Sequence, residues 1–187
     1  MSQEISPLEL ENRRRIYKLI ERFPGIHFRE LYRKLDLSMG SFEYHLNKLE
    51  RSNLIYLKKD SHYTRYFVTG KLGEEDKQLA SLLRNDRLRK ILFTLILEPG
   101  ISHKGLTKKL GWPKSTTSFY LKKLFDTKII EERETSIEDS KQTLGVGKPQ
   151  KGLHVTRPDK IIHLVVIYKT GFFDELSNRI LDLVEIL

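Results

Sequence analysis

Hydrophobic side chains recur at helical spacing in three stretches near the start of the chain. This spacing predicts helices over residues 6–23, 28–35 and 39–52. Ser6-Pro7-Leu8-Glu9 is typical of a helix start, and Pro24-Gly25 is typical of a helix end. Residues 55–59 and 63–69 have strand character, with a tight turn between them. The expected order is three helices followed by a two-stranded hairpin.

The same pattern returns 75 residues later without a gap. Pro24-Gly25-Ile26 falls on Pro99-Gly100-Ile101, and Leu46 and Leu49 fall on Leu121 and Leu124. The second copy predicts helices over residues 86–97, 104–110 and 114–127, and strands over 129–134 and 152–156. A long polar stretch separates these two strands. Because two copies are too few for a solenoid, we interpret the pattern as a duplicated small domain.

The repeat divides the chain into four parts. We expect a first domain at residues 1–70, a linker helix within 71–85, a second domain at 86–157 and a C-terminal helical segment at 158–187. The last segment is predicted to hold two helices, at 159–169 and 172–186. Its first apolar run is rich in β-branched residues, so a strand remains an alternative there.

The C-terminal segment carries more apolar surface than two small domains need. The simplest interpretation is a homodimer built on this surface, and the alternative is packing of the same stripe against the chain's own second domain. The residues predicted to dimerise are Phe172, Phe173, Leu176, Ile180, Leu183, Val184 and Leu187.

Composition narrows the functional class. The 187 residues include 34 Lys and Arg against 25 Asp and Glu, a net charge of +9, which favours an anionic partner. Cysteine is absent, which excludes disulfides, thiol catalysis and Cys-ligated metals. The N-terminus does not resemble a signal peptide and no apolar run could span a membrane, so we expect a soluble, cytoplasmic protein without a membrane partner.

Residue patterns typical of enzymes are missing. There is no phosphate-binding loop, no paired-carboxylate pattern and no Ser/His/Asp order, so we predict no catalytic activity and no cofactor. The six histidines do not show metal-binding spacing, and we predict no metal site. A site built from His and carboxylates across a dimer remains an alternative.

Two segments resemble a known class of regulators. Residues 26–31, 42–50 and 54–55, and in the second copy residues 101–110 and 115–124, resemble the winged helices of ArsR/MarR-type transcription regulators. The tandem arrangement is similar to archaeal regulators with two such domains. This resemblance covers residues 12–160 and implies a mainly α fold with small two-stranded β wings, namely two winged helix-turn-helix domains in tandem plus C-terminal helices.

The resemblance implies that each third helix enters the major groove and each wing contacts phosphates or the minor groove. Outward positions of the third helices are then the candidate DNA contacts. They are Ser41, Tyr44, Asn47 and Lys48 in the first copy, and Lys114, Thr116, Ser118, Phe119, Lys122 and Lys123 in the second. The wing candidates are Lys58, Lys59, Arg65 and Lys148. Tyr44, Asn47, Thr116, Ser118 and Lys122 are the strongest candidates for contacts with base edges.

The two copies differ in charge on the third helix. Glu43 in the first copy is repelled by phosphate unless it accepts a hydrogen bond from a cytosine amine, so we expect the second copy to make more of the contacts. The predicted function is sequence-specific binding of double-stranded DNA by a dimeric transcription regulator. The alternative is a protein-interaction scaffold in a transcription or replication assembly, with only non-specific affinity for DNA. An effector ligand or a protein partner is compatible with either function.

Overall fold

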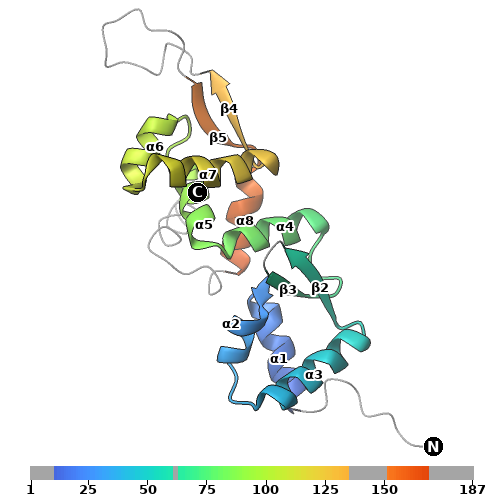
Figure 1. Ribbon diagram of the computed structural model, residues 1–187. Helices are drawn as coiled ribbons and strands as arrows, with labels where there is room; N and C mark the ends of the chain where they lie inside the picture. Colours follow the sequence, from blue (N-terminus) through green and yellow to red (C-terminus); the bar gives the residue numbers. More distant parts are fainter. Residues whose placement is uncertain (1–10, 61–62, 135–150, 169–187) are drawn as a thin grey trace, which may run out of the picture. The chain divides into compact units, whose positions relative to one another are not determined.

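The computed structural model describes residues 11–60, 63–134 and 151–168 (Figure 1). The chain divides into two compact units. Within the described ranges, residues 11–84 and 167–168 belong to the first unit and residues 85–166 to the second. Each unit contains the three helices and the antiparallel sheet that the repeat predicts, followed in each case by a fourth helix, α4 or α8.

The first unit contains four helices and a small sheet. Its elements are α1 (Glu11–Arg22), β1 (Ile26–His27), α2 (Phe28–Arg33), α3 (Met39–Arg51), β2 (Ile55–Asp60), β3 (Tyr63–Val68) and α4 (Glu74–Leu83). The strand order is β1-β3-β2, with Ile26 opposite Tyr66 and Ile55 opposite Val68. One face of each of α1, α2 and α3 is buried in a shared core. Its fully buried members include Ile16, Ile20, Ile26, Leu31, Phe42 and Leu49.

The second unit repeats the order. Its elements are α5 (Asp86–Leu97), α6 (His103–Leu110), α7 (Lys114–Asp126), β4 (Ile130–Glu134), β5 (Lys151–Val155) and α8 (Pro158–Ile167). β4 and β5 are antiparallel, with Ile130 opposite Val155. Ile101 forms an isolated antiparallel bridge with Leu153, at the position that β1 occupies in the first unit. α8 buries Ile161, Leu164 and Val165, so the apolar run before Tyr168 forms a helix and not a strand.

A glycine turn joins the first helix of each unit to its sheet. Gly25 has φ +76° and its N–H donates to the Tyr66 carbonyl at 3.0 Å. Gly100 has φ +86° and its N–H donates to the Leu153 carbonyl at 3.0 Å. A positive φ favours glycine, which explains why the Pro-Gly pair marks this point in both copies.

The fold class is confirmed, with one addition to the sheet. The wing of the first unit has two long strands as predicted, and β1 joins them as a short third strand. A two-residue strand leaves too little alternation to be detected from a sequence pattern. The predicted helix start at Ser6 and the predicted second C-terminal helix at 172–186 lie outside the described residues. Within the described ranges, no helix is long and apolar enough to cross a membrane.

Candidate nucleic-acid interface

In the first unit, α3 corresponds to the third helix of the motif. Ser38 precedes it as the N-cap, and its hydroxyl accepts a hydrogen bond from the Ser41 N–H at 3.3 Å. Phe42, Leu46 and Leu49 point into the core. The side chains of Glu43, Tyr44, Asn47 and Glu50 are exposed, and those of Ser41 and Lys48 are half-buried. Of the predicted outward residues, Tyr44 and Asn47 are exposed, and two carboxylates share their face.

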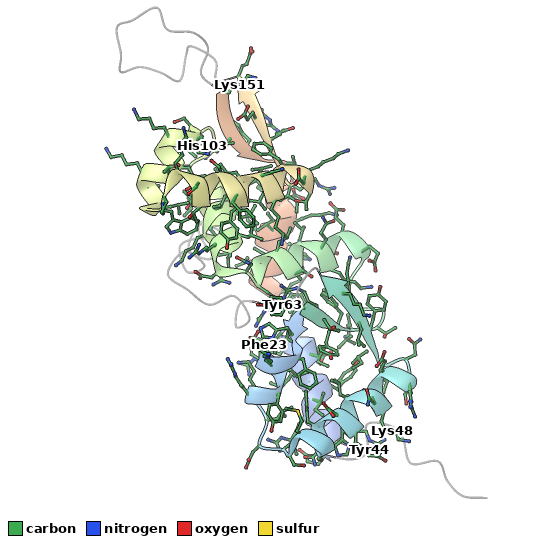
Figure 2. The ribbon with its side chains drawn as sticks, in the orientation of Figure 1. Phe23, Tyr44, Lys48, Tyr63, His103 and Lys151 are labelled. Atoms are coloured by element: carbon green, nitrogen blue, oxygen red, sulfur yellow. The ribbon has the colours of Figure 1, made fainter. Side chains whose placement is uncertain are left out.

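Tyr44 and Lys48 share this face, one helical turn apart (Figure 2). The Lys48 ammonium lies 5.7 Å from the centroid of the Tyr44 ring, within the range of a cation–π contact. The Tyr44 ring also makes an edge contact with His45, with centroids 5.2 Å apart. Burial of His45, together with the charge of Arg13, lowers the pKa of its imidazole. The neutral form of His45 is therefore favoured, so this histidine adds little positive charge to the face.

In the second unit, α7 occupies the same position. Leu121, Leu124 and Thr117 point inward, and Thr116 and Lys123 are half-buried. The exposed side chains of the helix are Lys114, Ser115, Ser118, Phe119, Lys122 and Asp126. From His103 to Phe125 the chain has six lysines and no acidic residue, whereas the matching residues 28–50 have four basic and four acidic residues. The α6–α7 pair should therefore attract a polyanion more strongly than the α2–α3 pair of the first unit.

Ser118 connects the two helices of this motif. Its hydroxyl lies 3.1 Å from Nε2 of His103, the first residue of α6. Ser102 caps α6 by accepting from the Gly105 N–H at 3.1 Å. The sequence pattern identified Ser118 as an outward residue but did not reveal this partner, because the pairing depends on how the two helices cross.

Aromatic side chains support the exposed face of α7. The ring of Phe119 makes an edge contact with Tyr120, with centroids 5.1 Å apart and an interplanar angle of 87°. The Arg87 guanidinium lies 5.7 Å from the Tyr120 ring and 5.8 Å from the Trp112 ring. Contacts of this kind restrict the side chain of Tyr120, against which Phe119 rests.

The first wing, formed by β2 and β3, has less unpaired positive charge than its sequence indicates. Lys59 is exposed, but the Lys58 ammonium lies 3.3 Å from a Glu74 carboxylate oxygen. Hydrogen bonds from Lys77 and from Lys58 lower the pKa of Glu74, which keeps that carboxylate charged. Lys58 therefore shares its charge with α4, whereas Lys59 is an exposed lysine of the wing.

Arg65, for which the sequence predicts a phosphate contact, is buried in the structure. Its side chain is only 6% exposed, and Nη1 donates to the Gly25 carbonyl at 2.9 Å. Arg65 lies on β3, which is the central strand because β1 pairs with its second edge. The arginine therefore has a structural role at the glycine turn.

The second wing differs in charge from the first. β4 exposes Glu132 and Glu134 beside half-buried Glu131, and the Arg133 guanidinium donates to a Glu131 oxygen at 2.7 Å. Lys151 is exposed at the start of β5. Lys148, the wing residue predicted from the sequence, lies outside the described residues. The seven predicted dimerisation residues, Phe172 to Leu187, also lie outside them.

A metal site is not supported by the part of the chain that the structure describes. No group of three or more His, Asp and Glu side chains there could hold a metal ion. The His27 imidazole has a structural contact: Nδ1 accepts from the Glu30 N–H at 3.2 Å and caps α2. This cap could not be predicted from the sequence, since histidine is not among the usual capping residues.

Two protein-family models match the chain, one in each unit. Residues 10–79 match a model described as an N-terminal HTH domain. Residues 84–131 match a model described as a winged helix-turn-helix DNA-binding family. The chain therefore carries two helix-turn-helix domains in tandem, and the second is similar to winged domains that bind DNA.

A relative with a similar sequence is the uncharacterized HTH-type transcriptional regulator of Methanocaldococcus jannaschii. It is 29% identical over 124 residues, which cover 66% of this chain and 31% of that protein. The chain therefore spans about a third of the length of this relative.

Proposed function

We propose that the protein is a dimeric transcription regulator that binds specific sites in double-stranded DNA, with α7 as its main helix in the major groove. The proposal rests mainly on the outward face of α6 and α7, the helix pair of the second unit. Lys114, Ser118 and Lys122 are exposed there, and no residue from His103 to Phe125 is acidic. Lysines supply the salt-dependent attraction to phosphate, and side chains near the start of the helix reach base edges.

The remaining parts of the proposal come from the sequence and the comparisons. Regulation of transcription is supported by the name of the archaeal relative, and an ArsR/MarR-like origin by the segments noted above. A homodimer is supported by the apolar C-terminal stripe, and it would present paired helices to a two-fold symmetric site. A cytoplasmic location follows from a DNA partner. The remaining base-edge candidates are Tyr44, Asn47 and Thr116.

The deciding experiment is selection from a pool of random duplex DNA at about 150 mM salt, where purely electrostatic binding is much weakened. Enrichment of a two-fold symmetric motif supports a dimeric regulator. Enrichment of an asymmetric motif supports specific binding but contradicts the symmetric dimer. Absence of any motif, with binding that disappears as salt increases, contradicts the proposal.

One observation favours the alternative function, a protein-interaction scaffold, for the first unit. The outward face of α3 exposes Glu43 and Glu50 beside Tyr44, a mixed surface that suits a protein partner better than phosphate. If Glu43→Gln raises the affinity for DNA without changing the selected motif, α3 lies near the DNA without reading it. If Glu43→Gln changes the motif, α3 is a reader of bases.

A further inference from the structure

The two units present an aromatic ring at the same place on the third helix. Tyr44 and Phe119 are 75 residues apart, the repeat period, and both are exposed: 52% for Tyr44 and 66% for Phe119. Each ring makes an edge contact with the next side chain of its helix, His45 in one unit and Tyr120 in the other. The shared position identifies a place on the motif where a ring faces outward.

The surroundings of the two rings differ. Tyr44 has a hydroxyl, a carboxylate neighbour in Glu43 and the Lys48 ammonium over its ring. Phe119 has no polar group, and the exposed side chains one turn away are Ser115 and Lys122. Phe119 also has the higher exposed fraction of the two. The Phe119 ring has no donor or acceptor for a conventional hydrogen bond, so its discrimination between bases would come from an apolar contact.

The major groove offers one apolar group on its base edges, the C5-methyl group of thymine. We propose that Phe119 is a specificity-determining residue that recognises thymine by contact with this methyl group. The inference rests on the proposed function, since it requires α7 in the major groove. The exposed Lys122 beside the ring, on a helix pair without acidic residues from His103 to Phe125, favours DNA over a protein partner because it attracts phosphates.

The contribution of this contact to DNA affinity can be estimated. Burying one methyl-sized group against the ring strengthens binding about four-fold, from the transfer free energy of such a group. The effect should be confined to one thymine in each half-site, since a single ring covers a single methyl group.

The test replaces thymine by uracil, which removes the C5-methyl group and leaves every hydrogen-bonding group in place. Each thymine of the selected site is replaced in turn, and affinities are measured for the full chain and for Phe119→Ala. We expect one position where uracil weakens the wild-type protein about four-fold but leaves the Phe119→Ala protein unchanged. Phe119→Leu, which keeps an apolar side chain, should retain part of the uracil effect.

Tyr44→Ala is the matched control, because it removes the equivalent ring of the other unit. It should preserve the uracil effect at the position that depends on Phe119. Circular dichroism checks that the variants are folded, which we expect because both side chains are exposed.

The remaining outcomes overturn the inference in distinguishable ways. If uracil effects are the same in the wild type and in Phe119→Ala at every position, Phe119 does not read thymine, while the selected site still supports the proposed function. If Phe119→Ala alters the oligomeric state in sedimentation and leaves the uracil effects unchanged, the ring covers a protein interface. If selection returns no site, the proposed function fails and this inference fails with it.

Discussion

Asn53 and Lys128 occupy the same strained place at the end of α3 and α7. They are 75 residues apart and have φ values of +54° and +56°. In each unit the next residue donates back to a carbonyl five residues earlier, Leu54 to Leu49 at 3.0 Å and Ile129 to Leu124 at 3.1 Å. This pair of features is a Schellman helix end, which turns the chain from the third helix into the wing.

Replacing Lys128 with glycine should stabilise the second unit. Lysine pays a steric cost in the left-handed region that glycine avoids, so we expect Lys128→Gly to raise the free energy of unfolding by about 1 kcal/mol. Asn53→Gly is the matched control and should gain less, because asparagine tolerates this conformation. Urea denaturation measures both changes. An equal gain at the two positions would contradict the explanation by side-chain type.

The close approach of Gly152 to the glycine turn makes alanine costly there. A Cβ at Gly152 would lie 2.5 Å from the Gly100 carbonyl oxygen, a backbone atom that cannot rotate away. We expect Gly152→Ala to lower the free energy of unfolding by about 1–3 kcal/mol. Gly40→Ala is the control, since a Cβ there meets nothing within 4 Å and alanine favours a helix. Thermal unfolding that places both variants at the wild-type midpoint would contradict the predicted clash.

Acid should destabilise the first unit through His27. Burial is the main cause of its lowered pKa, and Arg65, Arg84 and Arg33 lower it further against the opposing effect of Glu30. The unfolded chain, with a histidine pKa near 6.5, therefore takes up more protons than the folded chain as the pH falls. The contribution of neutral His27 to the free energy of unfolding is fully present above about pH 6.5 and decreases as the pH falls below that value. Protonation at Nδ1 also removes the acceptor that caps α2.

The variant His27→Asn separates this titration from other acid effects. Asparagine is a good N-cap but does not take up a proton, so the loss of stability between about pH 7 and pH 5.5 should become smaller. Part of the pH dependence should remain, since burial lowers the pKa of His45 in the same direction. Denaturation curves at several pH values measure the slope. A slope unchanged by His27→Asn would show that another group controls it.

Lys122 should contribute more to DNA binding than the residue that matches it in the first unit. Lys122 is exposed on a face without acidic residues, and its counterpart 75 residues earlier is Asn47. If Lys122 contacts a phosphate, Lys122→Gln should reduce the slope of log affinity against log salt by about 0.9. If it contacts a base edge, the slope should change little and discrimination should fall at one position.

Asn47→Ala is the matched control for this comparison. We expect it to leave the salt slope unchanged and to weaken specific binding less than Lys122→Gln does. Titrations at three or more salt concentrations measure both quantities. A larger loss with Asn47→Ala would move the main contact from α7 to α3.

The sequence pattern located the helices because their stability depends on local spacing and caps. The period of hydrophobic positions determined which faces of α3 and α7 are buried. The repeat added information that a single copy lacks, since Pro-Gly at two equivalent points indicates a required backbone conformation. Outward residues such as Tyr44, Phe119 and Lys122 were therefore predictable as outward.

Sequence alone determined the tandem architecture, the excess of lysine on the second helix pair and the absence of thiol chemistry. Only the tertiary structure decided which of the predicted contact residues have side chains that are exposed and unpaired enough to meet DNA. Arg65 is buried because β1 makes β3 a central strand, and Lys58 is paired because α4 places Glu74 beside it. His103 meets Ser118 only where two helices cross. Each of these contacts joins elements far apart in the chain, and local periodicity contains no information about such pairings.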